Sequence, residues 1–198
     1  MYIPAYSSMA DSNAWALMRE SPFALLVTAP DGMPFATSVP FTVLEESRTL
    51  LTHVSIANPQ WRHLQPEQEV LVVFQAEHAF VSSRWFESAP QVPTWNYATV
   101  HAYAKPRILE PAELHAQLYG LMQSYGHAAD MTALPTDYLE RMKNGIVGIG
   151  LEVTRLEGKH KLSQNRTPAD QRGAVTQLET QGELAQGVAA RMRANLER

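Results

Sequence analysis

Short apolar runs separated by turn residues fill the first 110 residues, and this spacing constrains the fold more than any other feature of the chain. Strands dominate this part of the chain and short turns separate them, a pattern that favours an antiparallel barrel over βαβ units. The interval from 69 to 83 is predicted to form a hairpin of two strands. The expected strands are FALLVTA (23–29), FATSVPFTV (35–43), TLLTHV (49–54), EVLVVFQA (69–76), HAFVSS (78–83) and TWNYATVHAYAKPRIL (94–109).

The second half of the chain changes period. Residues 111–126 place Leu114, Leu118 and Leu121 on one helical face. A second helix is expected over 137–145 and a central strand over 146–158, and two helices follow from Pro168. The predicted fold class is mainly β with added helices (α+β), built on an antiparallel barrel. The predicted domains are residues 1–166, with inserted helices at 111–144, and a helical extension at 167–198.

Composition excludes several classes of function. The 198 residues contain no cysteine, which excludes disulfides and thiolate metal sites. The formal net charge of −4 argues against a general nucleic-acid binder. No run is long and apolar enough for a membrane span and the start lacks a signal-peptide pattern, so cytoplasmic residence without membrane contact is expected. His53 and His101 lack a third ligand at metal-binding spacing, so no metal site is predicted.

The run GKHKLSQNR (158–166) carries Lys159, Lys161 and Arg166 directly after an apolar strand. Ser163, Gln164 and Asn165 add hydroxyl and amide groups. Donors at the end of a strand suit an anionic ligand at a sheet edge. The alternative is a solvated loop that caps a helix.

Two further clusters attract attention. Asn58-Pro59 predicts a helix whose first amides suit an anion, with His53 and Ser55 nearby; the alternative is a capped helix with Trp61 in the core. Trp95 and Tyr97 share one strand face and could stack a planar ring. Such a pair is also typical of a core or a dimer interface. No nucleophile elbow is present.

The motifs resemble those of a known family in order and in spacing. They are MYIP, PFATSVPF, HVSIANPQW, VLVVFQ, HAFVSSRWF, VPTWNYATVHAY, GIVG and KLSQNR. The chain resembles the FMN-binding negative transcriptional regulators of the PaiB family from residue 1 to about residue 172.

The resemblance implies a homodimeric split β-barrel, related in fold to pyridoxamine-phosphate oxidase, with FMN at the dimer interface. By position it places Thr37 and Ser38 beside the ring or ribityl chain, and it suggests that His53, Ser55, Asn58 and Gln60 approach the phosphate or ring. Lys161, Ser163 and Gln164 resemble contacts made across the dimer, and the aromatic strand with Trp95 suits the flavin. The chain departs from the family pattern at Thr52, Ser55, Ala76-Glu77 and Ala104.

Three functions follow from these observations. The first is an FMN-binding dimeric regulator, whose DNA contact is implied by the family alone. The second is an FMN-dependent oxidoreductase, such as a flavin reductase or oxidase, that acts on a small molecule. The third is a protein that binds haem or another planar ligand. The sequence names no acid or base, no substrate and no promoter.

Overall fold

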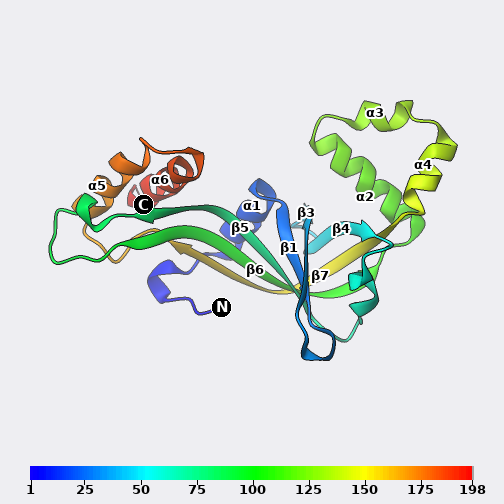
Figure 1. Cartoon of the computed structure of the whole chain (residues 1–198), viewed down its shortest axis with the longest axis horizontal. Helices are drawn as coiled ribbons and strands as arrows, with labels where there is room; N and C mark the ends of the chain where they lie inside the picture. The colour runs from blue at the N-terminus through cyan, green and yellow to red at the C-terminus, as the bar shows by residue number, and fades with distance from the viewer. Residues whose placement is uncertain (198) are drawn as a thin grey trace. The chain divides into compact units, whose positions relative to one another are not determined.

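The computed structural model describes residues 1–197, and its main element is a seven-stranded sheet with the order β2-β1-β5-β6-β7-β4-β3 (Figure 1). The strands are β1 (Phe23–Thr28), β2 (Phe35–Pro40), β3 (Thr42–Leu44), β4 (Thr49–Ser55), β5 (Val70–Val81), β6 (Thr94–Ile108) and β7 (Ile146–Lys161).

The two ends of the strand order approach each other, as expected for the predicted barrel. The first and last strands of its order, β2 and β3, are separated in the chain by Phe41 alone. The Thr52 hydroxyl on β4 donates to the carbonyl of Pro40 at the end of β2, at 2.7 Å. β1 pairs antiparallel with β2 and with β5, and β4 pairs antiparallel with β3 and β7.

Helices follow the capping signals in the sequence. Pro111 opens α2 in a capping box between Glu110 and Glu113, and Thr167 caps α5 by accepting from the N–H of Asp170. The α-helices are α1 (Asp11–Glu20), α2 (Pro111–Ser124), α3 (Ala128–Ala133), α4 (Thr136–Lys143), α5 (Pro168–Leu178) and α6 (Glu183–Leu196). The 3₁₀ turns are η1 (Ala5–Ser7), η2 (Pro30–Gly32), η3 (Pro59–His63) and η4 (Ser83–Trp85). None of the helices formed by residues 1–197 has the length and hydropathy that a bilayer crossing needs.

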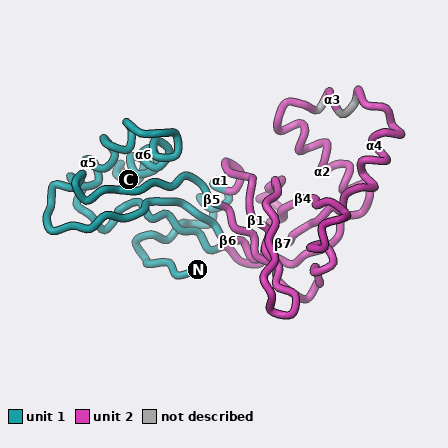
Figure 2. Tube along the Cα trace, in the orientation of Figure 1, with its two compact units in different colours: residues 1–17, 75–100, 157–198 teal, residues 18–74, 101–156 magenta. Residues whose placement is uncertain are grey.

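The chain divides into two compact units, shown in teal and magenta in Figure 2. Unit 1 comprises residues 1–17, 75–100 and 157–198. Unit 2 comprises residues 18–74 and 101–156. The long strands β5, β6 and β7 contribute residues to both units.

Each unit has an apolar core of its own. In unit 2, alternate residues of the strands fill the barrel, and the rings of Phe41 and Phe74 lie 5.5 Å apart. In unit 1, α5 and α6 pack their apolar stripes against the end of β5. Val81, Leu162, Leu178, Val188 and Met192 are each at most 2% exposed there.

The strand and helix positions agree with the sequence prediction except at three places. The predicted hairpin over 69–83 is wrong, because β5 runs unbroken from Val70 to Val81 and no turn-forming residue interrupts it. The run 35–43 is two strands, since Pro40 has no N–H and ends β2. Helix α3 was not predicted. The division of the chain into domains at 166/167 stays a prediction.

Candidate functional site

The cationic run at the end of β7 lies in unit 1, beside the start of β6. The ammonium group of Lys161 donates to the carbonyl of Trp95 at 2.9 Å and to the hydroxyl of Thr94. Burial lowers the pKa of Lys161; Tyr97 raises it by a smaller amount, and the positive charges of Lys159 and Arg166 lower it further. Lys161 is therefore a half-buried cation whose partners are neutral oxygens.

The two neighbouring cations are also held by uncharged groups. The ammonium group of Lys159 donates to the carbonyl of Tyr2 at 3.1 Å and lies 5.6 Å from the ring centroid of Tyr97. The guanidinium of Arg166 lies 5.4 Å from the ring centroid of Phe86. Within residues 1–197, no carboxylate lies at ion-pair distance from these three cations. Their positive charge is therefore available to an anion.

Ser163 and Gln164 shape the turn between these cations. Ser163 has a φ of 63°, which is unusual for a residue other than glycine, and it is 4% exposed. Asn96 fixes it, since the Asn96 amide donates to the Ser163 hydroxyl at 3.0 Å. The Gln164 amide bridges the turn by accepting from the N–H of Leu162 at 2.7 Å and donating to the carbonyl of His160 at 2.5 Å. The polar side-chain atoms of Ser163 and Gln164 thus form hydrogen bonds that hold the turn between Lys161 and Arg166.

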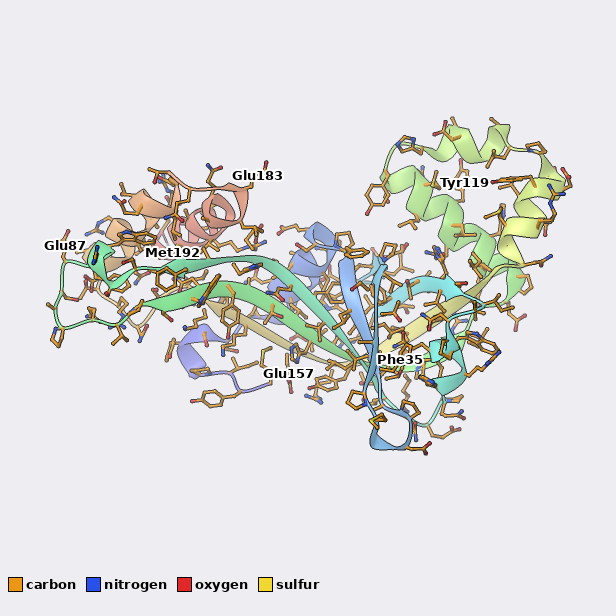
Figure 3. The ribbon with its side chains drawn as sticks, in the orientation of Figure 1. Phe35, Glu87, Tyr119, Glu157, Glu183 and Met192 are labelled. Carbon is orange, nitrogen blue, oxygen red and sulfur yellow. The ribbon has the colours of Figure 1, made fainter. Side chains whose placement is uncertain are left out.

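An aromatic pocket of about 520 Å³ lies in the same unit. Trp95 and Phe80 form its exposed walls, 53% and 46% exposed, with ring centroids 6.1 Å apart. His78 lies 6.0 Å from Trp95 by the same measure, and residues 181–185 at the start of α6 complete the lining. Glu183, labelled in Figure 3, stands in this first turn of α6. The pocket offers a planar ring an aromatic surface.

The predicted residues of unit 2 form a second group. The side-chain oxygen of Asn58 accepts from the backbone N–H of Gln60 at 2.9 Å, and the Asn58 side-chain amide donates to the Thr37 hydroxyl at 3.0 Å. Gln60 is fully buried, and its amide donates to the carbonyls of Leu26 at 2.9 Å and Phe35 at 3.3 Å. These bonds tie η3 to β1 and β2. Trp61 donates its indole N–H to the carbonyl of Ile56, so it belongs to the same local network.

The other predicted residues of unit 2 lie on β2 and β4. Ser38 and Ser55 are exposed, and the Ser55 hydroxyl accepts from the N–H of Ala57. Burial lowers the pKa of His53, and the neighbouring Gln117 amide raises it by a smaller amount. The structure thus brings Thr37, Asn58 and Gln60 together in unit 2. Trp95, Lys161, Ser163 and Gln164 are gathered in unit 1.

The sequence prediction missed His78 and Phe80. Both are i, i+2 neighbours on β5, and strict alternation would have placed them on one face. Both residues lie in the predicted strand 78–83, so this signal was present in the sequence. Among the described residues, no cluster of three or more His, Asp or Glu side chains has an arrangement that could hold a metal ion.

Comparison with known proteins shows which protein family this chain is similar to. A family model described as "Putative FMN-binding domain" matches residues 1–155. The chain is 36% identical over 188 residues to the "Protease synthase and sporulation protein PAI 2" of Bacillus subtilis, covering 91% of this chain and 90% of that protein. These matches confirm the resemblance read from the motifs.

Solved structures show the same fold at low identity. The "FAD and Heme binding protein" of Mycobacterium smegmatis has a TM-score of 0.61 at 17% identity, and the match covers 79% of this chain and 73% of that one. A "putative 5-nitroimidazole antibiotic resistance protein" of Bacteroides thetaiotaomicron has a TM-score of 0.59 at 15% identity, over 78% of this chain and 86% of that one. The predicted fold class, an antiparallel split β-barrel of the FMN-binding type with added helices, is confirmed.

Proposed function

Because the chain belongs to the family described as "Putative FMN-binding domain", we propose that it binds FMN and works as a homodimer. The observation that carries the proposal is the cluster of Lys159, Lys161 and Arg166, three cations without a carboxylate partner among the described residues. A phosphate monoester is the anionic group of FMN, and it accepts hydrogen bonds from ammonium and guanidinium donors. The donor set therefore fits the phosphate.

The surroundings of the cluster suit the rest of the cofactor. The Trp95 carbonyl accepts a hydrogen bond from Lys161, and Trp95 as a residue is 53% exposed. An exposed indole is a suitable stacking surface for an isoalloxazine ring. When bound, FMN would supply the redox chemistry, and the chain's own residues would orient it. The remaining proposed cofactor contacts are Thr37, Ser38, His53, Ser55, Asn58 and Gln60.

The outer wall of the barrel supports the homodimer. Along β1, the outward side chains are Phe23, Leu25 and Val27, and Leu25 and Val27 lie opposite Val73 and Leu71 of β5. Phe23 is 63% exposed. An antiparallel sheet that faces water normally carries polar residues on that side. We expect a second copy of the chain to cover this wall.

Two uses of a bound flavin remain within the proposal. A transcriptional regulator needs a surface that binds DNA. Unit 1 carries eight basic and eight acidic residues, whereas unit 2 carries eight basic and twelve acidic ones. Unit 1 is thus the part of the chain better suited to DNA phosphates. An oxidoreductase needs a substrate space, which the pocket beside Trp95 would provide.

The decisive experiment is titration of the purified protein with FMN and with riboflavin, which lacks the phosphate. We expect FMN to bind more tightly, and Lys161→Ala to lower FMN affinity about tenfold or more, because a charge-assisted hydrogen bond is lost. Asn58→Ala is expected to weaken binding as well. Lys105→Ala, which removes an exposed lysine of β6, serves as the control.

Spectra and assays separate the alternatives. A protein that stays monomeric and does not bind FMN would overturn the proposal, and a Soret band in the purified protein would favour haem. Bleaching of the flavin by NAD(P)H would favour the oxidoreductase. Salt-sensitive retention on promoter DNA at physiological ionic strength would favour the regulator.

A further inference from the structure

A buried carboxylate lies behind the cationic cluster. Asp170 on α5 is 1% exposed. One carboxylate oxygen accepts from the N–H of Glu87 at 2.8 Å and of Ser88 at 2.9 Å; the other accepts from the Ser88 hydroxyl at 2.5 Å. Glu87, labelled in Figure 3, belongs to the loop between β5 and β6. Asp170 therefore fixes the position of this loop.

Two neutral side chains continue the network from Asp170 to the cluster. The Ser88 hydroxyl accepts from the side-chain amide of Gln91 at 2.7 Å, and the side-chain oxygen of Gln91 accepts from the guanidinium of Arg166. The direction of every bond is set at Asp170. A carboxylate can only accept, so Ser88 gives it its one proton and can only accept from Gln91. The Gln91 amide must then present its oxygen to Arg166.

Other contacts hold the backbone of Arg166. Its N–H donates to the carbonyl of Ser163 at 2.9 Å, and its carbonyl accepts from the Gln171 amide at 3.0 Å. With the Phe86 ring below the guanidinium, Gln91 is the polar side chain that orients it. One of five guanidinium N–H donors is used in this contact, so others can reach a ligand.

We propose that Asp170 is a positioning residue that aims Arg166 at the phosphate through Ser88 and Gln91, an inference that rests on the proposed function. Two neutral links separate the carboxylate from the guanidinium. A direct ion pair would compensate the charge of Arg166 and weaken its attraction for an anion. The relay orients the guanidinium and leaves its charge available.

The test uses the ratio of FMN affinity to riboflavin affinity, because the two ligands differ only in the phosphate. Gln91→Leu breaks the relay and keeps the side-chain volume similar. We expect it to lower FMN affinity about tenfold and to leave riboflavin affinity unchanged. Ser88→Ala should act in the same direction, and thermal unfolding shows whether each variant is folded. Gln177→Leu, at an exposed position of α5, is the matched control.

A double variant shows whether the effect passes through Arg166. Arg166→Gln should remove most of the preference for FMN, and adding Gln91→Leu to it should change the ratio no further. If Gln91→Leu and Ser88→Ala keep the wild-type ratio, or lower both affinities equally, the positioning role is wrong while FMN binding stands. A wild-type protein with no preference for FMN over riboflavin would instead overturn the proposed phosphate site.

Discussion

Glu77 on β5 and Arg191 on α6 form an ion pair in which the Arg191 Nε donates to a Glu77 oxygen at 2.6 Å. Gly187, one turn earlier on α6, makes room for this pair, since a Cβ there would lie 2.4 Å from the Cγ of Glu77. The glycine of α6 and the carboxylate of β5 are therefore sterically coupled.

Gly187→Ala is expected to destabilise the protein by about 1–2 kcal/mol, because the added methyl group displaces Glu77. In a Glu77→Ala background the same change should be neutral or stabilising by up to about 1 kcal/mol, the ordinary preference of a helix for alanine. Denaturant unfolding of the four proteins measures the coupling. Equal effects in the two backgrounds would contradict the steric explanation.

Protonation of Asp170 is expected to be the main cause of the loss of stability of unit 1 at low pH. Hydrogen bonds from the Ser88 side chain and backbone, with smaller ones from Thr167 and Glu87, lower the pKa of Asp170 to about 2 from 3.8. A lowered carboxyl pKa contributes stability that is fully present above pH 3.8 and is lost as the pH falls towards 2. The melting temperature of Asp170→Asn should therefore vary less with pH than that of the wild type between pH 4 and pH 2. An unchanged slope would show that other groups control acid unfolding.

His53 should make stability depend on pH in a higher range. Burial lowers its pKa below 6.5, and its Nδ1 has no hydrogen-bond partner among the described residues. The unfolded chain then binds more protons than the folded one below pH 6.5, so stability falls as the pH drops through that range. His53→Leu should reduce the loss between pH 7 and pH 5.5, whereas His115→Leu, at an exposed position of α2, should retain it. The comparison needs only melting temperatures at the two pH values.

Gly173 on α5 should tolerate no side chain. A Cβ there would lie 2.3 Å from the carbonyl oxygen of Trp85, a backbone atom that cannot rotate away. Gly173→Ala is expected to cost about 3 kcal/mol. Gly120→Ala in α2 is the opposite case, because no heavy atom would lie within 4 Å of the new methyl group. It should stabilise by up to about 1 kcal/mol, and chemical denaturation compares the two variants.

Local patterns predicted most of the fold. Alternating apolar residues and turn residues identified β1, β4 and β6, and Pro111 and Pro168 indicated where α2 and α5 begin. The predicted break in β5 is wrong because Glu77 lies within the strand and pairs with Arg191 on α6. Its partner Arg191 is 114 residues away, a distance over which no local pattern carries information.

The candidate site was only partly accessible to sequence reasoning. The cations of the 158–166 run stand out because they are contiguous. The relay that orients Arg166 draws on residues 88, 91 and 170, which meet only after α5 docks on the loop before β6. Asn58 and Gln60 stay predicted cofactor contacts. Their bonds to Thr37 and Leu26 depend on strand packing that the motif itself does not encode.

The passage from β2 to β3 through Phe41 has a consequence for how the protein would fail. Because β2 and β3 stand at the two ends of the strand order, each has a single strand neighbour among residues 1–197, and Phe41 alone joins the two edge strands. Cleavage of the chain at Phe41 would leave β2 paired with β1 and β3 paired with β4, but the two edges could then move apart, and a separated strand edge is a template for aggregation.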